Sequence, residues 1–75
     1  MERYANRSGN SGVVAYQIGT DYIWVQFTSG TIYEYTNSSA GSSNIETMKT
    51  YAQAGSGLCS FIKRYVNKGY SRQIR

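Results

Sequence analysis

The segment from residue 22 to residue 35 places a large apolar side chain at every second position and is interrupted once, around Gly30. Successive side chains of a strand point to opposite faces, so Ile23, Val25 and Phe27 share one face. A similar alternation follows the glycine. We therefore predict two strands joined by a short turn, and the length of that turn decides which residues lie opposite each other.

The apolar face determines the register of this hairpin. A two-residue turn would place Val25 opposite Glu34 and bring a charge into the apolar face. A three-residue turn of residues 28–30, with Gly30 in the left-handed conformation of a G1 bulge, keeps the face apolar. A shift by one residue would move the whole set to the other face. The predicted opposed pairs are Ile23 with Tyr35, Val25 with Tyr33 and Phe27 with Thr31.

The flanking segments predict one further strand and two helices. Residues 13–19 begin with β-branched side chains and alternate at Val14, Tyr16 and Ile18, which is typical of a strand. Residues 37–44 are rich in serine and predict an exposed loop.

Capping residues place the two helices. Ser43 and Glu46 form a capping box for a short helix that Gly55 ends, and Ser56 can cap a second helix. The apolar side of the second helix consists of Leu58, Phe61, Ile62, Tyr65 and Val66.

The resulting order, β-β-β-α-α, predicts an α+β fold in which a three-stranded antiparallel sheet carries two helices packed on one face. The other face of the sheet then has no helix over it. Trp24 and Ile32 would point toward that open face. Such apolar side chains indicate either contact with a partner or cover by the terminal segments, and both explanations stay open.

Charges are distributed unevenly along the chain. Residues 1–48 contain two basic and four acidic side chains, whereas residues 49–75 contain six basic and no acidic ones. A cationic C-terminal third is typical of proteins that bind an anion such as nucleic acid. The alternative is a solvated helix face that only keeps the protein soluble.

Few side chains of this chain suit catalysis. It contains no histidine, its four carboxylates fall on separate predicted elements, and Cys59 lies beside the apolar side of a helix. We therefore predict a non-enzymatic protein without catalytic residues, metal or cofactor. A single cysteine excludes an internal disulfide, and no apolar run reaches the length of a membrane span. The N-terminal segment lacks the hydrophobic stretch of a secretory signal, so a cytoplasmic location without membrane contact is expected.

Two candidate binding sites lie in the cationic third. The first combines cations that can pair with phosphates and a ring on which bases can stack, and consists of Lys63, Arg64, Lys68, Tyr70 and Arg72. Tyr65 is expected in the core. The second is an anion-binding loop of Gly55, Ser56 and Gly57 before the second helix, for which a tight helix connector is the alternative.

These residues predict a small module that binds nucleic acid or a nucleotide-like anion through its basic C-terminal helix and tail. The alternative is a protein-interaction module, such as a small inhibitor or adaptor encoded by a phage or mobile element. Its contact surface would be Trp24, Ile32 and an exposed face or edge of the sheet. A homo-oligomer is compatible with either function.

From residue 18 to residue 65 the chain resembles the KTSC family, named after a domain at the C-terminus of some lysyl-tRNA synthetases. The similar positions are Ile18, Gly19, Thr20, Asp21, Trp24, Val25, Gln26, Phe27, Gly30, Tyr33, Tyr35, Gly55, Gly57, Leu58 and Ile62. The resemblance implies a small α+β module without an established activity, and the neighbouring tRNA enzyme favours a nucleic-acid partner. We expect one KTSC-like domain over residues 13–70, a polar and partly mobile arm over residues 1–12, and a basic tail over residues 71–75.

Overall fold

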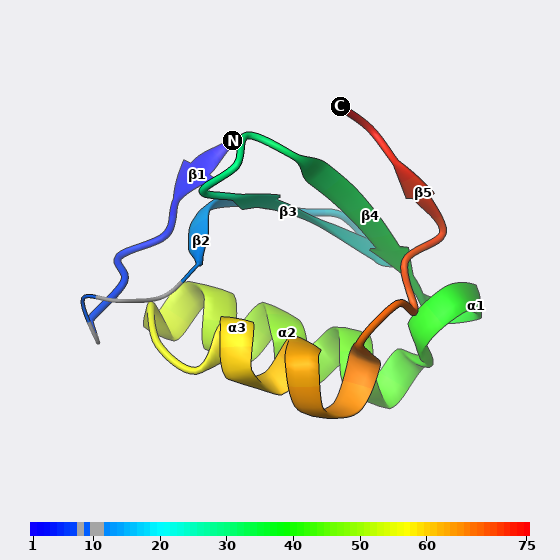
Figure 1. Cartoon of the computed structure of the whole chain (residues 1–75). Helices are drawn as coiled ribbons and strands as arrows, with labels where there is room; N and C mark the ends of the chain where they lie inside the picture. Colours follow the sequence, from blue (N-terminus) through cyan, green and yellow to red (C-terminus); the bar gives the residue numbers. More distant parts are fainter. Residues whose placement is uncertain (8, 10–11) are drawn as a thin grey trace.

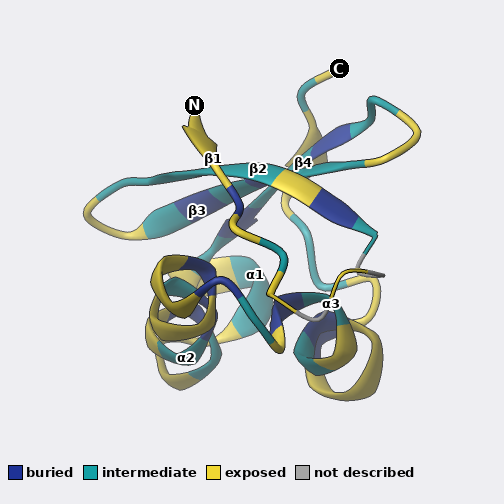
Figure 2. Ribbon diagram, turned by 90° about the vertical axis from the view of Figure 1, so that its left-hand side faces the viewer, coloured by how far each residue is buried: buried dark blue, intermediate teal, exposed yellow. Residues whose placement is uncertain are grey.

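The computed structural model describes residues 1–7, 9 and 12–75, and it shows an antiparallel sheet with helices packed against one face (Figures 1 and 2). The elements are β1 (Glu2–Arg3), β2 (Val13–Ile18), β3 (Tyr22–Phe27), β4 (Ile32–Thr36), α1 (Asn37–Ala40), α2 (Ser42–Ala54), α3 (Leu58–Phe61), the π-helical turn η1 (Ile62–Val66) and β5 (Arg72–Gln73). Neighbouring strands of the sheet follow the chain order. Figure 2 shows the sheet as one layer and α2 and α3 side by side as the second.

The hairpin of β3 and β4 has the predicted bulged register. Ile23 lies opposite Tyr35, and Val25 lies opposite Tyr33. In the turn, the backbone N–H of Gly30 donates to the carbonyl of Phe27 at 2.8 Å, and Gly30 has a φ of 91°. This positive φ is the left-handed conformation that a G1 bulge requires.

The core lies between the sheet and the helices. Ile23 and Val25 are completely buried, and Tyr35 is 2% exposed. Burial raises the pKa of the Tyr35 hydroxyl, because the charged phenolate is disfavoured away from water. The other buried side chains of this cluster are Tyr4, Val13, Ile45, Met48, Ala52, Leu58, Ile62 and Val66. Each of the larger apolar ones stabilises the fold by about 1.5–3 kcal/mol.

A β-bulge changes the alternation of β2. Val13 pairs with Phe27 and Ala15 pairs with Gln26, so Val14 is an additional residue in the strand. Val13 is therefore buried while Val14 is 40% exposed. The alternation predicted at Val14, Tyr16 and Ile18 is therefore broken at Val14.

Within the described residues the sheet has five strands, so the prediction of three was wrong. The two additional strands, β1 and β5, contain only two residues each. Glu-Arg and Arg-Gln are polar pairs without the β-branched alternation by which a strand is recognised. Pairing with the backbone of β2 and β4 places them in the sheet.

The predicted N-terminal arm contributes to the core. Tyr4, directly after β1, is 3% exposed, and its hydroxyl accepts a hydrogen bond of 3.3 Å from the backbone N–H of Leu58. This bond connects the arm to the start of α3. Residues 8, 10 and 11 of the arm lie outside the described residues.

The segment after β4 is helical where a loop was predicted. Thr36 caps α1 in a reciprocal capping box with Ser39, with distances of 3.1 and 3.0 Å. α2 then begins at Ser42, before the predicted cap at Ser43. Glu46 therefore falls within the helix, where it pairs with Lys49 at 3.2 Å.

The second predicted helix begins as α3 and continues as η1, in which the backbone N–H of Asn67 donates to the carbonyl of Ile62. A π turn contains more residues than an α turn, so side chains four apart stay aligned along one face. Leu58, Ile62 and Val66 are accordingly buried. Tyr65 is rotated away and is 62% exposed, so its predicted place in the core was wrong.

Gly30→Val should lower the free energy of unfolding by about 1–3 kcal/mol, because a β-branched residue adopts a positive φ only with strain. A Cβ at this position would have no atom within 4 Å, so we expect the cost to come from the conformation and not from crowding at the Cβ. Gly30→Asn is the matched control and should cost clearly less. Urea unfolding of both variants measures the difference, and equal costs would contradict the bulged turn.

Candidate nucleic-acid interface

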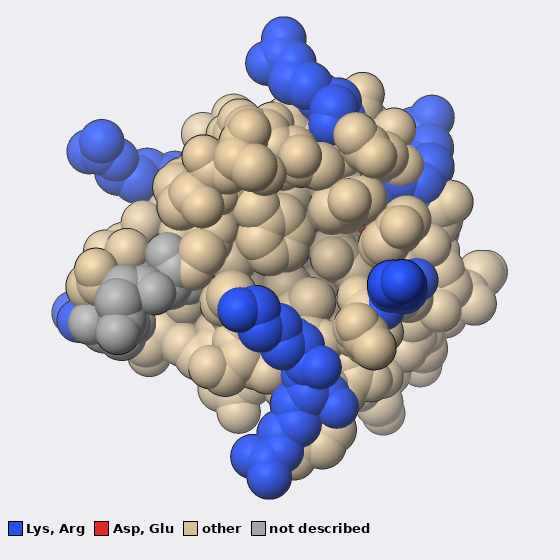
Figure 3. Space-filling view, in the orientation of Figure 1, with Lys and Arg blue, Asp and Glu red and all other residues tan. Residues whose placement is uncertain are grey.

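A cationic surface covers η1 and the residues that follow. Lys63, Arg64 and Lys68 are all exposed there. In the described part of the chain, the carboxylates in ion pairs are Glu34 and Glu46, and they pair with other basic residues. Figure 3 shows basic side chains projecting from the lower centre, over the position of α3 and the orange turn after it in Figure 1. We call Lys63, Arg64 and Lys68 the basic triad.

An aromatic cluster adjoins the basic triad. The ring centroids of Tyr51 and Phe61 are 5.6 Å apart, and those of Phe61 and Tyr65 are 5.1 Å apart. The guanidinium carbon of Arg64 lies 5.8 Å from the centre of the Tyr65 ring. These groups border a pocket of about 290 Å³ whose lining residues are Tyr51, Gly57, Ser60, Phe61, Arg64 and Tyr65. The helical periodicity assigned Tyr65 to the core, so the cluster was not predicted.

Tyr70 packs against the sheet. Its ring stacks on Tyr33 with a centroid distance of 4.2 Å and an interplanar angle of 30°, and its edge meets Tyr35 at 6.3 Å. The side chain is half-buried. Tyr70 was predicted as the available stacking ring, whereas Tyr65 is the more exposed of the two tyrosines.

Arg72 lies on the open face of the sheet, opposite the helices, in a polar cluster around Glu34. The indole N–H of Trp24 donates to Glu34 Oε2 at 2.9 Å, and the Ser71 hydroxyl donates to Oε1 at 2.8 Å. Arg72 Nε donates to the same oxygen at 3.2 Å. Hydrogen bonds from Trp24 and Ser71, together with the charge of Arg72, hold the pKa of the Glu34 carboxyl below its ordinary value. Glu34 therefore pairs with a cation that was predicted to bind a ligand.

The two predicted interface residues have different surroundings. Ile32 is only 8% exposed, and its carbonyl accepts a hydrogen bond of 2.7 Å from the N–H of Ile74. Trp24 is half-buried and lies beside Tyr22, with a centroid distance of 5.9 Å. Of the pair, Trp24 is the one with more surface on the open face of the sheet.

The predicted anion loop of Gly55, Ser56 and Gly57 is packed against the N-terminal arm. Its Gly55 carbonyl accepts a hydrogen bond of 2.7 Å from the N–H of Arg7. A Cβ on Gly55 would lie 2.5 Å from the Cβ of Ala5. The N–H of Leu58 at the end of the loop already donates to Tyr4. These contacts favour the alternative role of a tight connector between α2 and α3.

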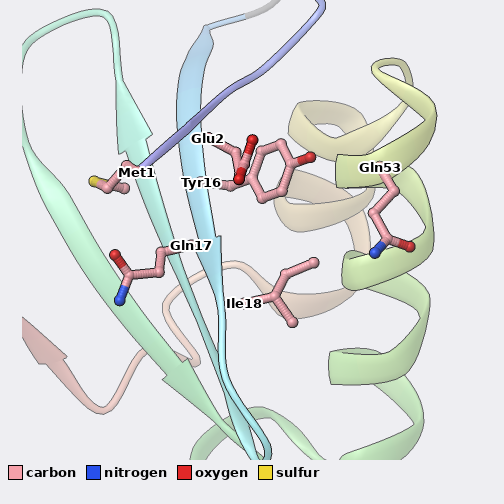
Figure 4. Close-up of a pocket in the computed structure, with 6 residues that line it drawn as sticks. All are labelled: Met1, Glu2, Tyr16, Gln17, Ile18 and Gln53. Carbon is pink, nitrogen blue, oxygen red and sulfur yellow. The ribbon is translucent and has the colours of Figure 1, made fainter.

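A second pocket, of about 420 Å³, lies between β2 and α2 (Figure 4). Tyr16 and Ile18 extend from β2 toward Gln53 of α2 in this view. The other lining residues are Met1, Glu2 and Gln17. Among these described lining residues, the carboxylate of Glu2 is the one charged side chain.

Neither a metal centre nor a membrane helix was found in the described residues. They contain no group of three or more histidine, cysteine or acidic side chains that could hold a metal ion. In the same part of the chain, no helix is long and apolar enough to cross a membrane.

The stability of the fold should fall when Glu34 is protonated. The pKa of Glu34 is lowered in the folded state, so the unfolded chain binds the proton more tightly than the folded chain does. The ionised Glu34 carboxylate therefore stabilises the fold above pH 4.5, and this stabilisation is lost as the pH falls through the lowered pKa. Glu34→Gln should be less stable at neutral pH and lose less stability in acid. Glu46→Gln controls for net charge. Urea unfolding across the acid range measures the effect, and an unchanged acid dependence in Glu34→Gln would contradict it.

Comparison with known proteins found no match: no protein-family model, no curated protein and no solved structure matches this chain. The resemblance to the KTSC family therefore stays a prediction from the residues quoted above.

Proposed function

We propose that this chain is a small non-enzymatic module that binds nucleic acid through the basic triad and the exposed ring of Tyr65. The observation that carries the proposal is the combination of three exposed cations with an adjacent aromatic cluster. Cations pair with phosphates, and aromatic rings stack on bases, so the two features together suit a polynucleotide better than either does alone. A nucleotide-like small anion would use the same chemistry.

The positions of the acidic residues support this proposal. Glu34 lies on the open face of the sheet and is bonded to Arg72, and Glu46 on α2 is paired with Lys49. Neither carboxylate neutralises a cation of the basic triad. An approaching phosphate would therefore meet positive charge that no ion pair within the described residues has cancelled.

The rival function, protein interaction through the open face of the sheet, has less support. One of its two predicted contact residues, Ile32, is buried, and the polar group of the other, Trp24, donates to Glu34. A hot spot of a protein interface is typically a large side chain that becomes buried only on binding. The aromatic ring that is most exposed lies instead on the helical layer, at Tyr65. A nucleic-acid partner also agrees with the resemblance to the KTSC family, which we keep as part of this proposal.

Binding to a fluorescently labelled single-stranded oligonucleotide should weaken as salt is raised, because cations that neutralise phosphates release counterions. If all three members of the triad contact phosphates, the slope of log affinity against log salt should be about −2, since each contact contributes about −0.7. Lys63→Gln combined with Arg64→Gln should bring the slope to about −0.7 and weaken binding. Fluorescence anisotropy at several salt concentrations measures both quantities.

The matched control is Arg3→Gln combined with Arg75→Gln. It removes the same charge from exposed positions in β1 and at the end of the chain. The control should retain most of the wild-type affinity and slope, and both double variants should keep the wild-type unfolding midpoint. Equal losses in the two variants would mean that net charge alone drives binding. Unchanged binding in the Lys63 and Arg64 variant would overturn the proposed surface.

A further inference from the structure

We infer that the pocket bordered by Tyr51, Phe61 and Tyr65 takes one unpaired base, so that the protein prefers single-stranded nucleic acid to duplex. This inference rests on the proposed function and names its substrate class. It starts from the exposure of Tyr65, which is 62%, and of Tyr51, which is 37%. Both rings offer surface to a ligand because neither is taken up by the core.

The surrounding contacts hold the pocket in shape. Phe61 is half-buried and packs against the core. Its ring is therefore held in place between the rings of Tyr51 and Tyr65. Gly57 lies under Tyr51: a Cβ there would stand 3.4 Å from Cδ1 of the tyrosine. With a φ of 86°, Gly57 also has a conformation that other residues rarely adopt. The pocket is therefore largely formed before a ligand arrives, which lowers the entropy lost on binding.

The size of the pocket suits a single base. Its volume of about 290 Å³ is close to the lower end of the range of small-molecule sites, about 300 Å³. The bases of a duplex are stacked and paired, so their faces are not available to a tyrosine ring. A base of a single strand can turn out of its stack and lie against the ring at little cost.

The charge of the pocket suits a base that carries a phosphate. Arg64 belongs to the lining and lies over the ring of Tyr65, while Lys63 is its neighbour in the basic triad. A guanidinium group can stack on a base or pair with a phosphate oxygen. The Ser60 hydroxyl, also in the lining, adds a group that can donate to the edge of a base or to a phosphate.

The test compares affinities for a single-stranded oligonucleotide and for its duplex. Tyr65→Leu should weaken single-strand binding by about 5- to 150-fold, which corresponds to the roughly 1–3 kcal/mol of one stacked base, and should leave duplex binding unchanged. Tyr65→Phe is the matched control, because it keeps the ring and should keep the affinity. The side chain is exposed, so both variants should fold as the wild type does.

The outcomes separate this inference from the proposed function. If Tyr65→Leu binds single strands as the wild type does, while loss of Lys63 and Arg64 weakens binding, the base pocket is overturned and the cationic surface stands. If the wild type binds neither form at low salt, the proposed function is overturned together with the pocket. If Tyr65→Leu abolishes self-association in sedimentation and no nucleic acid binds, the cluster is a protein interface and the inference is overturned.

Discussion

The register of β3 and β4, set by the left-handed Gly30, is the constraint on which the rest of the structure depends. It turns Ile23, Val25 and Tyr35 into the core, and it turns Trp24 and Glu34 to the open face. A shift of one residue would exchange these sets, because side chains alternate along a strand. The helical layer could then no longer pack against an apolar surface.

The same register determines how the end of the chain is held. Trp24 lies opposite Glu34 in β3 and β4, and Glu34 lies opposite Arg72 in β4 and β5. The carboxylate of Glu34 therefore receives hydrogen bonds from strands on both sides. On the other face, Tyr33 supports the ring of Tyr70.

This attachment separates Arg72 from the basic triad. Arg72 becomes part of the sheet and is neutralised by Glu34, whereas the basic triad stays with the helical layer. The change from α3 to η1 then exposes Tyr65 beside Arg64. The candidate site thus results from local helix geometry, and the sheet contributes by pairing Arg72 with Glu34 and by packing Tyr70 against Tyr33.

The sequence predicted those features that depend on alternation within one segment. The hairpin register followed from the apolar face, and Gly55 was recognised as the end of α2, where its φ is 77°. The cap of α1 was missed because its partner for Thr36 is Ser39, whereas the usual capping box has glutamate or glutamine there.

Features that depend on distant partners were not predictable in this way. β1 and β5 are too short to carry a periodic pattern, and they exist through pairing with β2 and β4. The exposure of Tyr65 depends on a single π turn. The spacing of apolar side chains in the sequence does not show where an α-helix changes to a π turn. As a result the cations of the candidate site were identified, while the ring that accompanies them was assigned to the core.

Titration of isotope-labelled protein with a single-stranded oligonucleotide, followed by nuclear magnetic resonance, tests the central claim most directly. We expect the largest shifts at the backbone amides of Phe61, Arg64 and Tyr65. The indole N–H of Trp24, the single tryptophan, reports on the open face of the sheet and should not move. Shifts concentrated at Trp24 and its neighbours in β3 and β4, with α3 and η1 unaffected, would contradict the account.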